Sequence, residues 1–301
     1  MKLVTFVSAG AIAYGVHLDD AVLNLPLAAT LAGEPALPSD MIGFIATGSA
    51  GLATARRLIA ATGAVLEARI PTGQVRLLAP IPRPAKNVFC VGRNYVDHVA
   101  EGYRARGTEI KLPEFPQFFT KPPTAVIGPD ETFTHNPDLT QMLDYEVELA
   151  VIIGTRGCDI AADDAFQHVY GYTIANDITA RDLQRRHDQW FKGKGLDRSC
   201  PLGPWIVTAD DIADYRAIEL SLFVNGERRQ NAKVAQMIFD IPAIIASLSA
   251  GMTLEPGDII ITGTPSGVGY AMTPPHPLKA GDEVVCEIAP IGRLVTRIVG
   301  K

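Results

Sequence analysis

The sequence predicts an α+β fold that is mainly β-structure, with a small leading domain in front of a larger one. Beyond residue 80, short apolar segments alternate with turn residues, without the regular strand-helix-strand order of a doubly wound sheet. Helical segments are few, chiefly 180–190 and 241–250. We therefore expect a β-sandwich or roll. Its predicted strands are 88–91, 148–153, 170–175, 218–224, 258–262 and 283–288.

The leading segment is predicted to form a hairpin, a helix over 51–62 and a strand over 64–70. The glycines at 48 and 51 lack the three-glycine spacing of a dinucleotide site, so we expect no nicotinamide cofactor. Prolines at 80, 82 and 84 form a linker. We therefore expect a small α/β domain over 1–80 and a catalytic domain over 81–301.

Charge and cysteine content narrow the function classes. The 301 residues have a net charge of −6 and no block of Lys or Arg, which argues against nucleic acid or an anionic membrane as partner. The scattered cysteines fit a reducing compartment, and Cys200 is interpreted as a small buried residue rather than a nucleophile. No segment has the length of a membrane span. We expect a cytoplasmic protein that acts on a small molecule.

Two carboxylates, Glu146 and Glu148, open an apolar β-branched run that continues to residue 153. Side chains two apart in a strand share a face, so the two carboxylates point the same way. Ala150 and Ile152 continue that face, which favours the rim of a pocket over a solvated edge. Two neighbouring buried carboxylates repel each other unless a cation compensates them.

Asp177 follows the strand predicted over 170–175 and is the third acidic candidate. Thr179 and Asp182 have the spacing of a capping box, which would leave Asp177 free for another role. Two Glu and one Asp, with no His or Cys nearby in sequence, suit Mg²⁺, Mn²⁺ or Ca²⁺ rather than zinc.

A His–Glu pair and one lysine are further candidates outside this triad. His98 and Glu101 are three residues apart on a short predicted helix, where a carboxylate beside an imidazole makes a base able to deprotonate water. A surface pair of no catalytic importance has the same spacing, so both interpretations stay open. Lys194 lies in a glycine-rich loop and is either a solvated lysine or a cation that stabilises an enolate.

Together these motifs resemble the fumarylacetoacetate hydrolase family, in particular its bacterial acylpyruvate hydrolases and related 2-oxo acid enzymes. The resemblance extends over nearly the whole chain. It depends on the ordered segments 91–95, 98–101, 119–122, 146–148, 176–184, 203–205 and 262–265, together with Lys194.

The resemblance implies a mixed β-sandwich roll, a homodimer, and Mg²⁺ or Mn²⁺ held by Glu146, Glu148 and Asp177. It places Lys194 in the pocket, and His98 and Glu101 on a mobile lid helix. It further implies substrate-binding roles, which fall on Arg93, Tyr95, Arg181, Gln184 and Thr264.

We expect hydrolysis of a C–C bond in an acylpyruvate or related 1,3-diketo acid, such as fumarylpyruvate, with release of pyruvate. The metal would act as a Lewis acid on the 2-oxo acid, and His98 would activate water. An alternative uses the same metal site for oxaloacetate decarboxylation or tautomerisation, or for ureidoglycolate-type lyase chemistry. The sequence leaves this choice open.

Two segments are expected to decide substrate choice. Val234 and Gln236 stand where many relatives have Thr and Asp, so their loop is expected to shape a different pocket. The segment 101–116 is a plausible lid, whose Arg104 and Arg106 would either bind a second carboxylate or face water.

Overall fold

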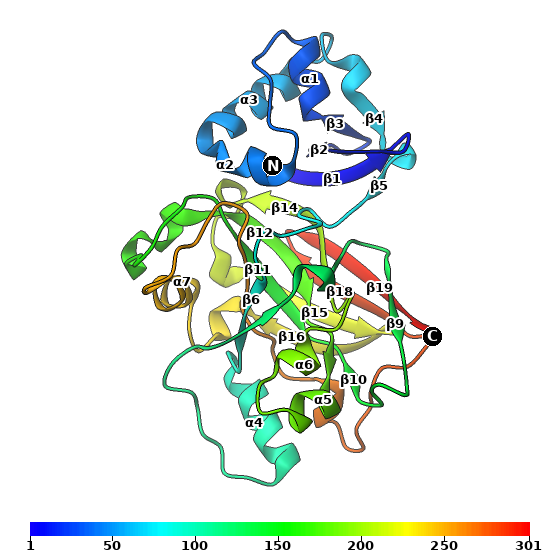
Figure 1. The fold of residues 1–301 in the computed structure, drawn as a ribbon, viewed down its shortest axis with the longest axis vertical. Helices are drawn as coiled ribbons and strands as arrows, with labels where there is room; N and C mark the ends of the chain where they lie inside the picture. Colours follow the sequence, from blue (N-terminus) through cyan, green and yellow to red (C-terminus); the bar gives the residue numbers. More distant parts are fainter.

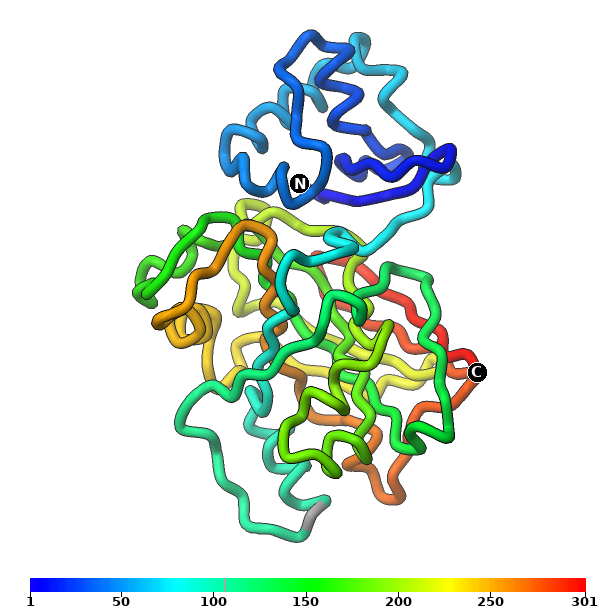
Figure 2. Tube along the Cα trace, in the orientation of Figure 1, coloured from blue at the N-terminus to red at the C-terminus, as the bar shows by residue number. Residues whose placement is uncertain are grey.

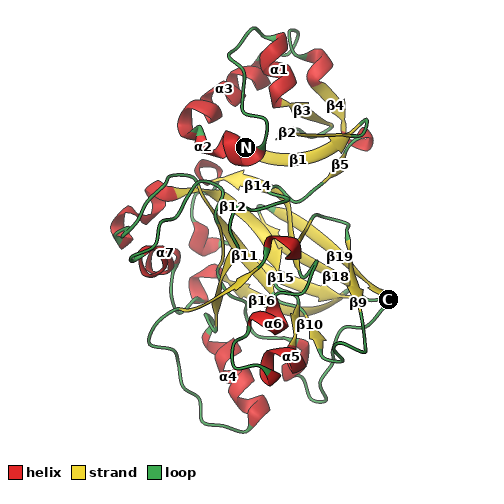
Figure 3. Ribbon diagram, viewed as in Figure 1, coloured by secondary structure: helices red, strands yellow, loops and turns green.

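The structure is a computed structural model that describes the backbone of all 301 residues and every side chain except that of Arg106. It confirms the predicted α+β, mainly β class. Figure 1 shows a smaller lobe, blue to cyan, above a larger lobe that contains the rest of the chain. Figure 3 shows that strands fill the interior of the larger lobe and that its helices lie toward the outside.

The smaller lobe packs helices against an antiparallel sheet. Its strands are β1 (Lys2–Ser8), β2 (Ala11–His17), β3 (Ala21–Asn24), β4 (Arg69–Pro71) and β5 (Arg76–Leu77), and its helices are α1 (Leu25–Leu31), α2 (Met41–Ala46) and α3 (Gly48–Ala60). The predicted strand over 64–70 was mostly wrong, because a 3₁₀ turn over Leu66–Ala68 precedes β4. β1 pairs with β14 of the larger lobe, so one sheet runs through both.

The central sheet has the order β4-β3-β2-β1-β14-β12-β11-β17-β6-β7. In it, β11 (Val147–Ile153) lies antiparallel between β12 (Val169–Asn176) and β17 (Ile259–Ile261). Every residue of β11 is buried, which explains its continuous apolar run. The other strands of the larger lobe's part of this sheet are β6 (Val88–Gly92), β7 (Gln117–Lys121), β8 (Val126–Ile127) and β14 (Cys200–Thr208).

A second sheet packs on the first with the order β16-β15-β18-β19-β9. Leu149 of β11 and Leu222 of β15 belong to the same buried core, as in a sandwich. The strands of this sheet and of the β10-β13 pair are β9 (Thr132–His135), β10 (Leu143–Asp144), β13 (Thr179–Ala180), β15 (Glu219–Val224), β16 (Glu227–Lys233), β18 (Glu283–Ala289) and β19 (Gly292–Gly300).

Helices α4 (Val96–Arg106), α5 (Arg181–Arg186) and α6 (Phe191–Lys194) lie at one end of the larger lobe, and α7 (Ile241–Ser249) covers its flank. Figure 2 shows the long loop over 107–116 that leads from α4 to β7. The described residues contain no helix with both the length and the apolar character needed to cross a bilayer.

The predicted helix over 180–190 is divided at His187, whose backbone is extended. The predicted capping box was also wrong. Thr179 donates its hydroxyl to the Asp177 carbonyl, and Asp182 accepts from the Thr140 hydroxyl and two backbone N–H groups, of which one belongs to its neighbour Leu183. Helix α5 therefore begins without a side-chain cap.

Candidate active site

The structure brings Glu146, Glu148 and Asp177 together, with one carboxylate oxygen of each within 4.8 Å of the others. The antiparallel register explains this, because Val147 at the start of β11 pairs with Asn176 at the end of β12. The Asp177 N–H donates to the Glu146 carbonyl at 2.8 Å. All three side chains are buried, so strand pairing alone assembles a deep acidic cluster.

Buried cations surround these carboxylates. Lys194 Nζ donates to Glu146 Oε2 at 2.7 Å and to Asp177 Oδ2 at 2.6 Å. Lys121 Nζ lies 2.6 Å from Asp177 Oδ1. Arg181 lies between Glu146 Oε1, at 2.6 Å, and Asp144 Oδ2, at 2.9 Å. Lys194 remains charged, since Asp177 and Glu146 raise its pKa although burial opposes them.

Glu146 and Glu148 differ in their electrostatic surroundings. Burial raises the pKa of both, but Lys194 and Arg181 outweigh it at Glu146 and hold that pKa below its usual range. At Glu148, burial and the charges of Asp177 and Glu146 raise the pKa well above 4.5. The Gly263 N–H, 2.5 Å from Glu148 Oε2, compensates only part of this cost.

This cluster fits a divalent cation. Among the described residues, four buried carboxylates, including Asp144, face three buried cations, which leaves one negative charge when all are ionised. Glu148 is the carboxylate without an ion pair in the described part of the site. Oxygen donors alone, with no His or Cys, suit Mg²⁺ or Mn²⁺. A bound divalent ion would give the site a net positive charge, which favours an anionic substrate.

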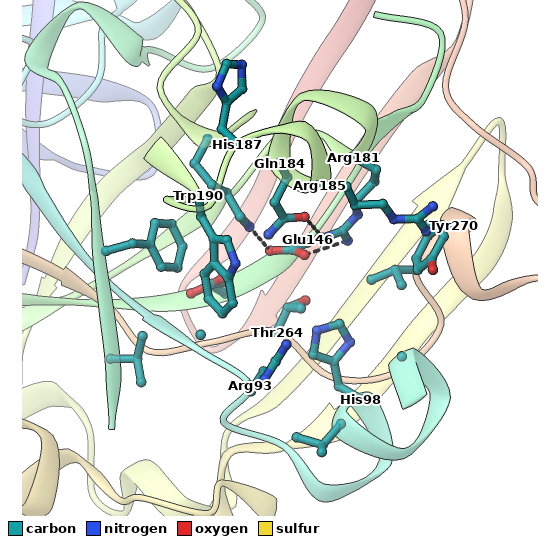
Figure 4. A pocket seen from close by; sticks show the side chains of 18 of the residues that line it. Arg93, His98, Glu146, Arg181, Gln184, Arg185, His187, Trp190, Thr264 and Tyr270 are labelled. Carbon is teal, nitrogen blue, oxygen red and sulfur yellow. Dashed lines mark hydrogen bonds and ion pairs between the residues drawn. The ribbon is translucent and has the colours of Figure 1, made fainter. Parts of the chain in front are cut away.

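A cavity of about 380 Å³ opens beside this cluster (Figure 4). Most of the predicted site residues line it, and Asp177, Glu101 and Tyr95 are not among the lining residues. The predicted residues that line it are Arg93, His98, Glu146, Glu148, Arg181, Gln184, Lys194 and Thr264. Phe119, Trp190, Tyr270, Arg185, His187 and Asp188 also line it, although the sequence interpretation did not assign them.

His98 and Glu101 form a hydrogen-bonded pair, with Nδ1 and Oε1 2.8 Å apart. The other oxygen of Glu101 accepts the Gly267 N–H at 2.8 Å, which ties α4 to the loop after β17. A carboxylate can only accept, so Nδ1 of His98 donates to it, and in the neutral imidazole Nε2 is then the nitrogen with the lone pair. Figure 4 shows the His98 ring at the cavity, where Nε2 of the neutral imidazole can accept a proton.

The fumarylacetoacetate (FAA) hydrolase C-terminal family model matches residues 87–299. The chain belongs to the fumarylacetoacetate hydrolase family. This confirms the family resemblance, and the matched range includes the acidic cluster and the residues that line the cavity.

Similar proteins are named for activity on oxaloacetate and on maleylpyruvate. The chain is 51% identical over 225 residues to oxaloacetate tautomerase YisK of Bacillus subtilis, covering 75% of this chain and 73% of the relative. It is 44% identical over 268 residues to the mitochondrial oxaloacetate tautomerase FAHD2B of Bos taurus, covering 88% and 82%. The solved maleylpyruvate hydrolase of Sphingobium, in complex with manganese(II) and pyruvate, is 33% identical over 100% and 99% of the chains, with a TM-score of 0.74.

Two of the predicted substrate residues, Thr264 and Gln184, have hydrogen-bond partners that restrict them, and a third, Tyr95, does not line the main cavity. The Thr264 hydroxyl donates to the Val147 carbonyl at 3.0 Å and accepts from Gln230. Gln184 Oε1 accepts from Arg181 at 3.2 Å. Tyr95 begins α4, and its buried hydroxyl has no hydrogen-bond partner among the described residues. It lines a separate cavity of about 260 Å³.

Of the residues named in the two segments expected to decide substrate choice, those described do not line the main cavity. Val234 is buried in the core, and Gln236 accepts the Lys233 N–H, so neither lines the main cavity. Arg104 is exposed and does not line it, and the side chain of Arg106 lies outside the described residues.

Helix α5 and the segment after it supply most of the cavity-lining residues that the sequence interpretation did not assign. Arg185 lies one helical turn from Arg181, a spacing that could have identified it. Trp190 packs so closely on Gly92 that a Cβ there would lie 2.3 Å from its ring. Cys200 is fully buried, which agrees with its interpretation as a small buried residue, and burial raises its thiol pKa to about 12.

Proposed function

We propose that this chain is a divalent-metal-dependent enzyme that catalyses the keto–enol tautomerisation of oxaloacetate. The observation behind this proposal is the identity to oxaloacetate tautomerases, 51% to YisK and 44% to FAHD2B. The maleylpyruvate hydrolase is 33% identical. This proposal replaces the sequence-based preference for C–C bond hydrolysis with the alternative that used the same metal site.

Glu146, Glu148 and Asp177 would hold the metal, which we propose to be Mg²⁺ or Mn²⁺. When bound, the ion would withdraw electrons from the 2-oxo group and so acidify the protons on C3. Lys194 and Arg181 keep Glu146 ionised, whereas Glu148, whose pKa is raised by burial and by Asp177 and Glu146, would lose its proton when the ion binds.

The reaction needs a group that moves a proton at C3. His98 Nε2 would take that proton, the C–H electron pair would become the C2–C3 double bond, and the π pair of the C2=O bond would move onto the C2 oxygen. The imidazolium would then return the proton to that oxygen. No water is consumed and no bond between carbons breaks. Glu101 holds the imidazole in the required tautomer and stabilises it once protonated.

Hydrolysis of an acylpyruvate remains the second candidate, because the same pair suits activation of water. The maleylpyruvate hydrolase supports this candidate, since that related structure was solved in complex with manganese(II) and pyruvate. In this chain, hydrolysis would require room for a water molecule between His98 and a distal carbonyl group.

The test is to add enol-oxaloacetate to the Mg²⁺- or Mn²⁺-loaded protein and follow the decay of enol absorbance. Malate dehydrogenase detects the keto product, and lactate dehydrogenase detects pyruvate from maleylpyruvate, acetylpyruvate or fumarylpyruvate. We expect accelerated enol decay that a chelator removes, and no pyruvate. Pyruvate release from an acylpyruvate, without acceleration of the enol decay, would reject tautomerisation in favour of hydrolysis.

We further propose, from the family resemblance, that the protein is a cytoplasmic homodimer whose catalytic domain begins near residue 81. The bovine relative is described as mitochondrial, so location varies within the group. Light scattering on the purified chain tests the dimer, and expression of residues 81–301 tests the boundary.

A further inference from the structure

Arg185 is an unassigned cation at the cavity. It lies on α5, lines the cavity, and its guanidinium carbon is 3.9 Å from the centroid of the Tyr270 ring. It forms no ion pair among the described residues. Figure 4 shows Arg185 and Tyr270 together on one side of the cavity, with Trp190 on the other.

The other cations that line the cavity are engaged differently. Lys194 is bonded to Glu146 and Asp177, and Arg181 is held by Asp144 and Glu146. Arg93 packs near the rings of Tyr103 and Trp190, at 5.7 and 5.3 Å. Arg185 therefore differs from Lys194 and Arg181, because an aromatic ring holds it and no carboxylate among the described residues does.

The backbone that carries the Tyr270 ring is held in place. The backbone N–H groups of Gly269 and Tyr270 donate to Asp144 at 2.8 and 3.1 Å. Asp144 is buried and also accepts from Arg181 at 2.9 Å, so one carboxylate positions both Arg181 and the backbone of Tyr270. A Cβ at Gly269 would lie 2.3 Å from the His276 carbonyl oxygen, which restricts this loop further.

We propose that Arg185, stacked on Tyr270, binds the second carboxylate of a 2-oxo dicarboxylic acid whose 2-oxo acid end lies at Glu146 and Glu148. A ring that contacts the face of a guanidinium leaves its N–H edge free, and that edge can grip a carboxylate with two parallel hydrogen bonds. This inference rests on the proposed function and specifies its substrate class as dicarboxylic.

Binding is measured separately from turnover. Calorimetry with the Mg²⁺-loaded protein compares malate with 2-hydroxybutanoate, which has a methyl group in place of the second carboxylate. NMR in D₂O compares C3 proton exchange in oxaloacetate and 2-oxobutanoate. The variant is Arg185→Gln, and Arg186→Gln is its matched control, because Arg186 is an exposed neighbour that does not line the cavity.

We expect Arg185→Gln to weaken malate binding and to raise the KM for oxaloacetate about 10- to 100-fold, the effect of a lost charge-assisted hydrogen-bond pair. The affinity of Arg185→Gln for 2-hydroxybutanoate, and all binding constants and KM values of Arg186→Gln, should change less than about twofold. Arg185→Lys should recover part of the loss, because it keeps the charge but not the fork.

Two outcomes overturn the inference. One is an equal loss for malate and 2-hydroxybutanoate in Arg185→Gln. The other is a dicarboxylate-selective loss in Arg93→Gln with none in Arg185→Gln. If the unmodified protein prefers malate through Arg185 but exchanges no C3 protons, the dicarboxylate site stands and the proposed tautomerisation fails.

Discussion

The two sides of the cavity are built differently. The metal side consists of buried carboxylates at neighbouring ends of β11 and β12, where a backbone hydrogen bond joins Asp177 to Glu146 next to the β11-β12 pair. The other side consists of half-buried or exposed side chains on α4 and α5, such as His98 and Arg185. Individual side-chain contacts, from Glu101 to Gly267 and from Arg185 to Tyr270, position these groups.

This difference separates the common chemistry from the choice of substrate. Strand pairing fixes the carboxylates in a geometry that any 2-oxo acid could use. Helix residues at the cavity can change without breaking a sheet, so they are where related enzymes can diverge in substrate. Variants on the two sides should therefore fail in different ways.

The largest effect is expected on the strand side. Glu148→Ala should remove a metal ligand and lower activity by at least about 1,000-fold, since Lewis-acid catalysis is lost with the ion. Electron paramagnetic resonance of Mn²⁺ measures binding in parallel. Glu219→Ala, an exposed carboxylate on β15, is the control and should behave as the unmodified protein. Full activity in Glu148→Ala would refute the metal assignment.

On the helix side, His98→Ala should lower kcat by about 100- to 10,000-fold, the usual contribution of a general base. Mn²⁺ affinity should stay within about twofold, because His98 belongs to α4 and not to the acidic cluster. Loss of metal binding in this variant would show that the two sides are coupled. An unchanged kcat would require another residue to move the proton.

Asp144 links the two sides, so its removal should affect both. Asp144→Asn should raise KM about 10-fold and lower the free energy of unfolding by about 3 kcal/mol, since Arg181 loses one of its two buried partners. Chemical denaturation and steady-state kinetics measure the two effects. Asp282→Asn is the control: Asp282 is buried and accepts the Lys279 N–H, so stability should fall while KM is unchanged.

Metal binding should depend on pH through Glu148. Its raised pKa means that the metal-free folded protein keeps this proton at a pH where the unfolded chain has lost it. Stability of the metal-free protein therefore falls as pH rises above about 4.5. Because a divalent ion must displace the proton, its gain in Tm should increase between about pH 5 and 8. Thermal scans with and without Mn²⁺ measure it, and a gain that shrinks over this range would contradict the assignment.

The smallest effect is expected at Cys200. It is fully buried on β14, and its raised pKa keeps the thiol protonated. Cys200→Ala should change kcat less than about twofold and cost about 1 kcal/mol of stability. A large loss of kcat with an unchanged Tm would point to a chemical role on the strand side.

The parts of the site that were predicted correctly are those that the local periodicity of strands and helices determines. The alternation of a strand placed Glu146 and Glu148 on one face, and the helical spacing placed His98 beside Glu101. The strand over 64–70 and the helix over 180–190 were correct only in part. The strand begins at Arg69 and the helix ends at Arg186, because tertiary packing and the extended backbone at His187 decide those boundaries.

The sequence by itself determined the fold class, the family and the residues able to form an acidic cluster, because strand period and residue chemistry are local properties. Only the tertiary structure decided which groups surround that cluster. Lys121 reaches Asp177 across 56 residues, and Asp144 reaches Tyr270 across 126. Contacts of this separation depend on how distant strands and loops are packed, which no local pattern encodes.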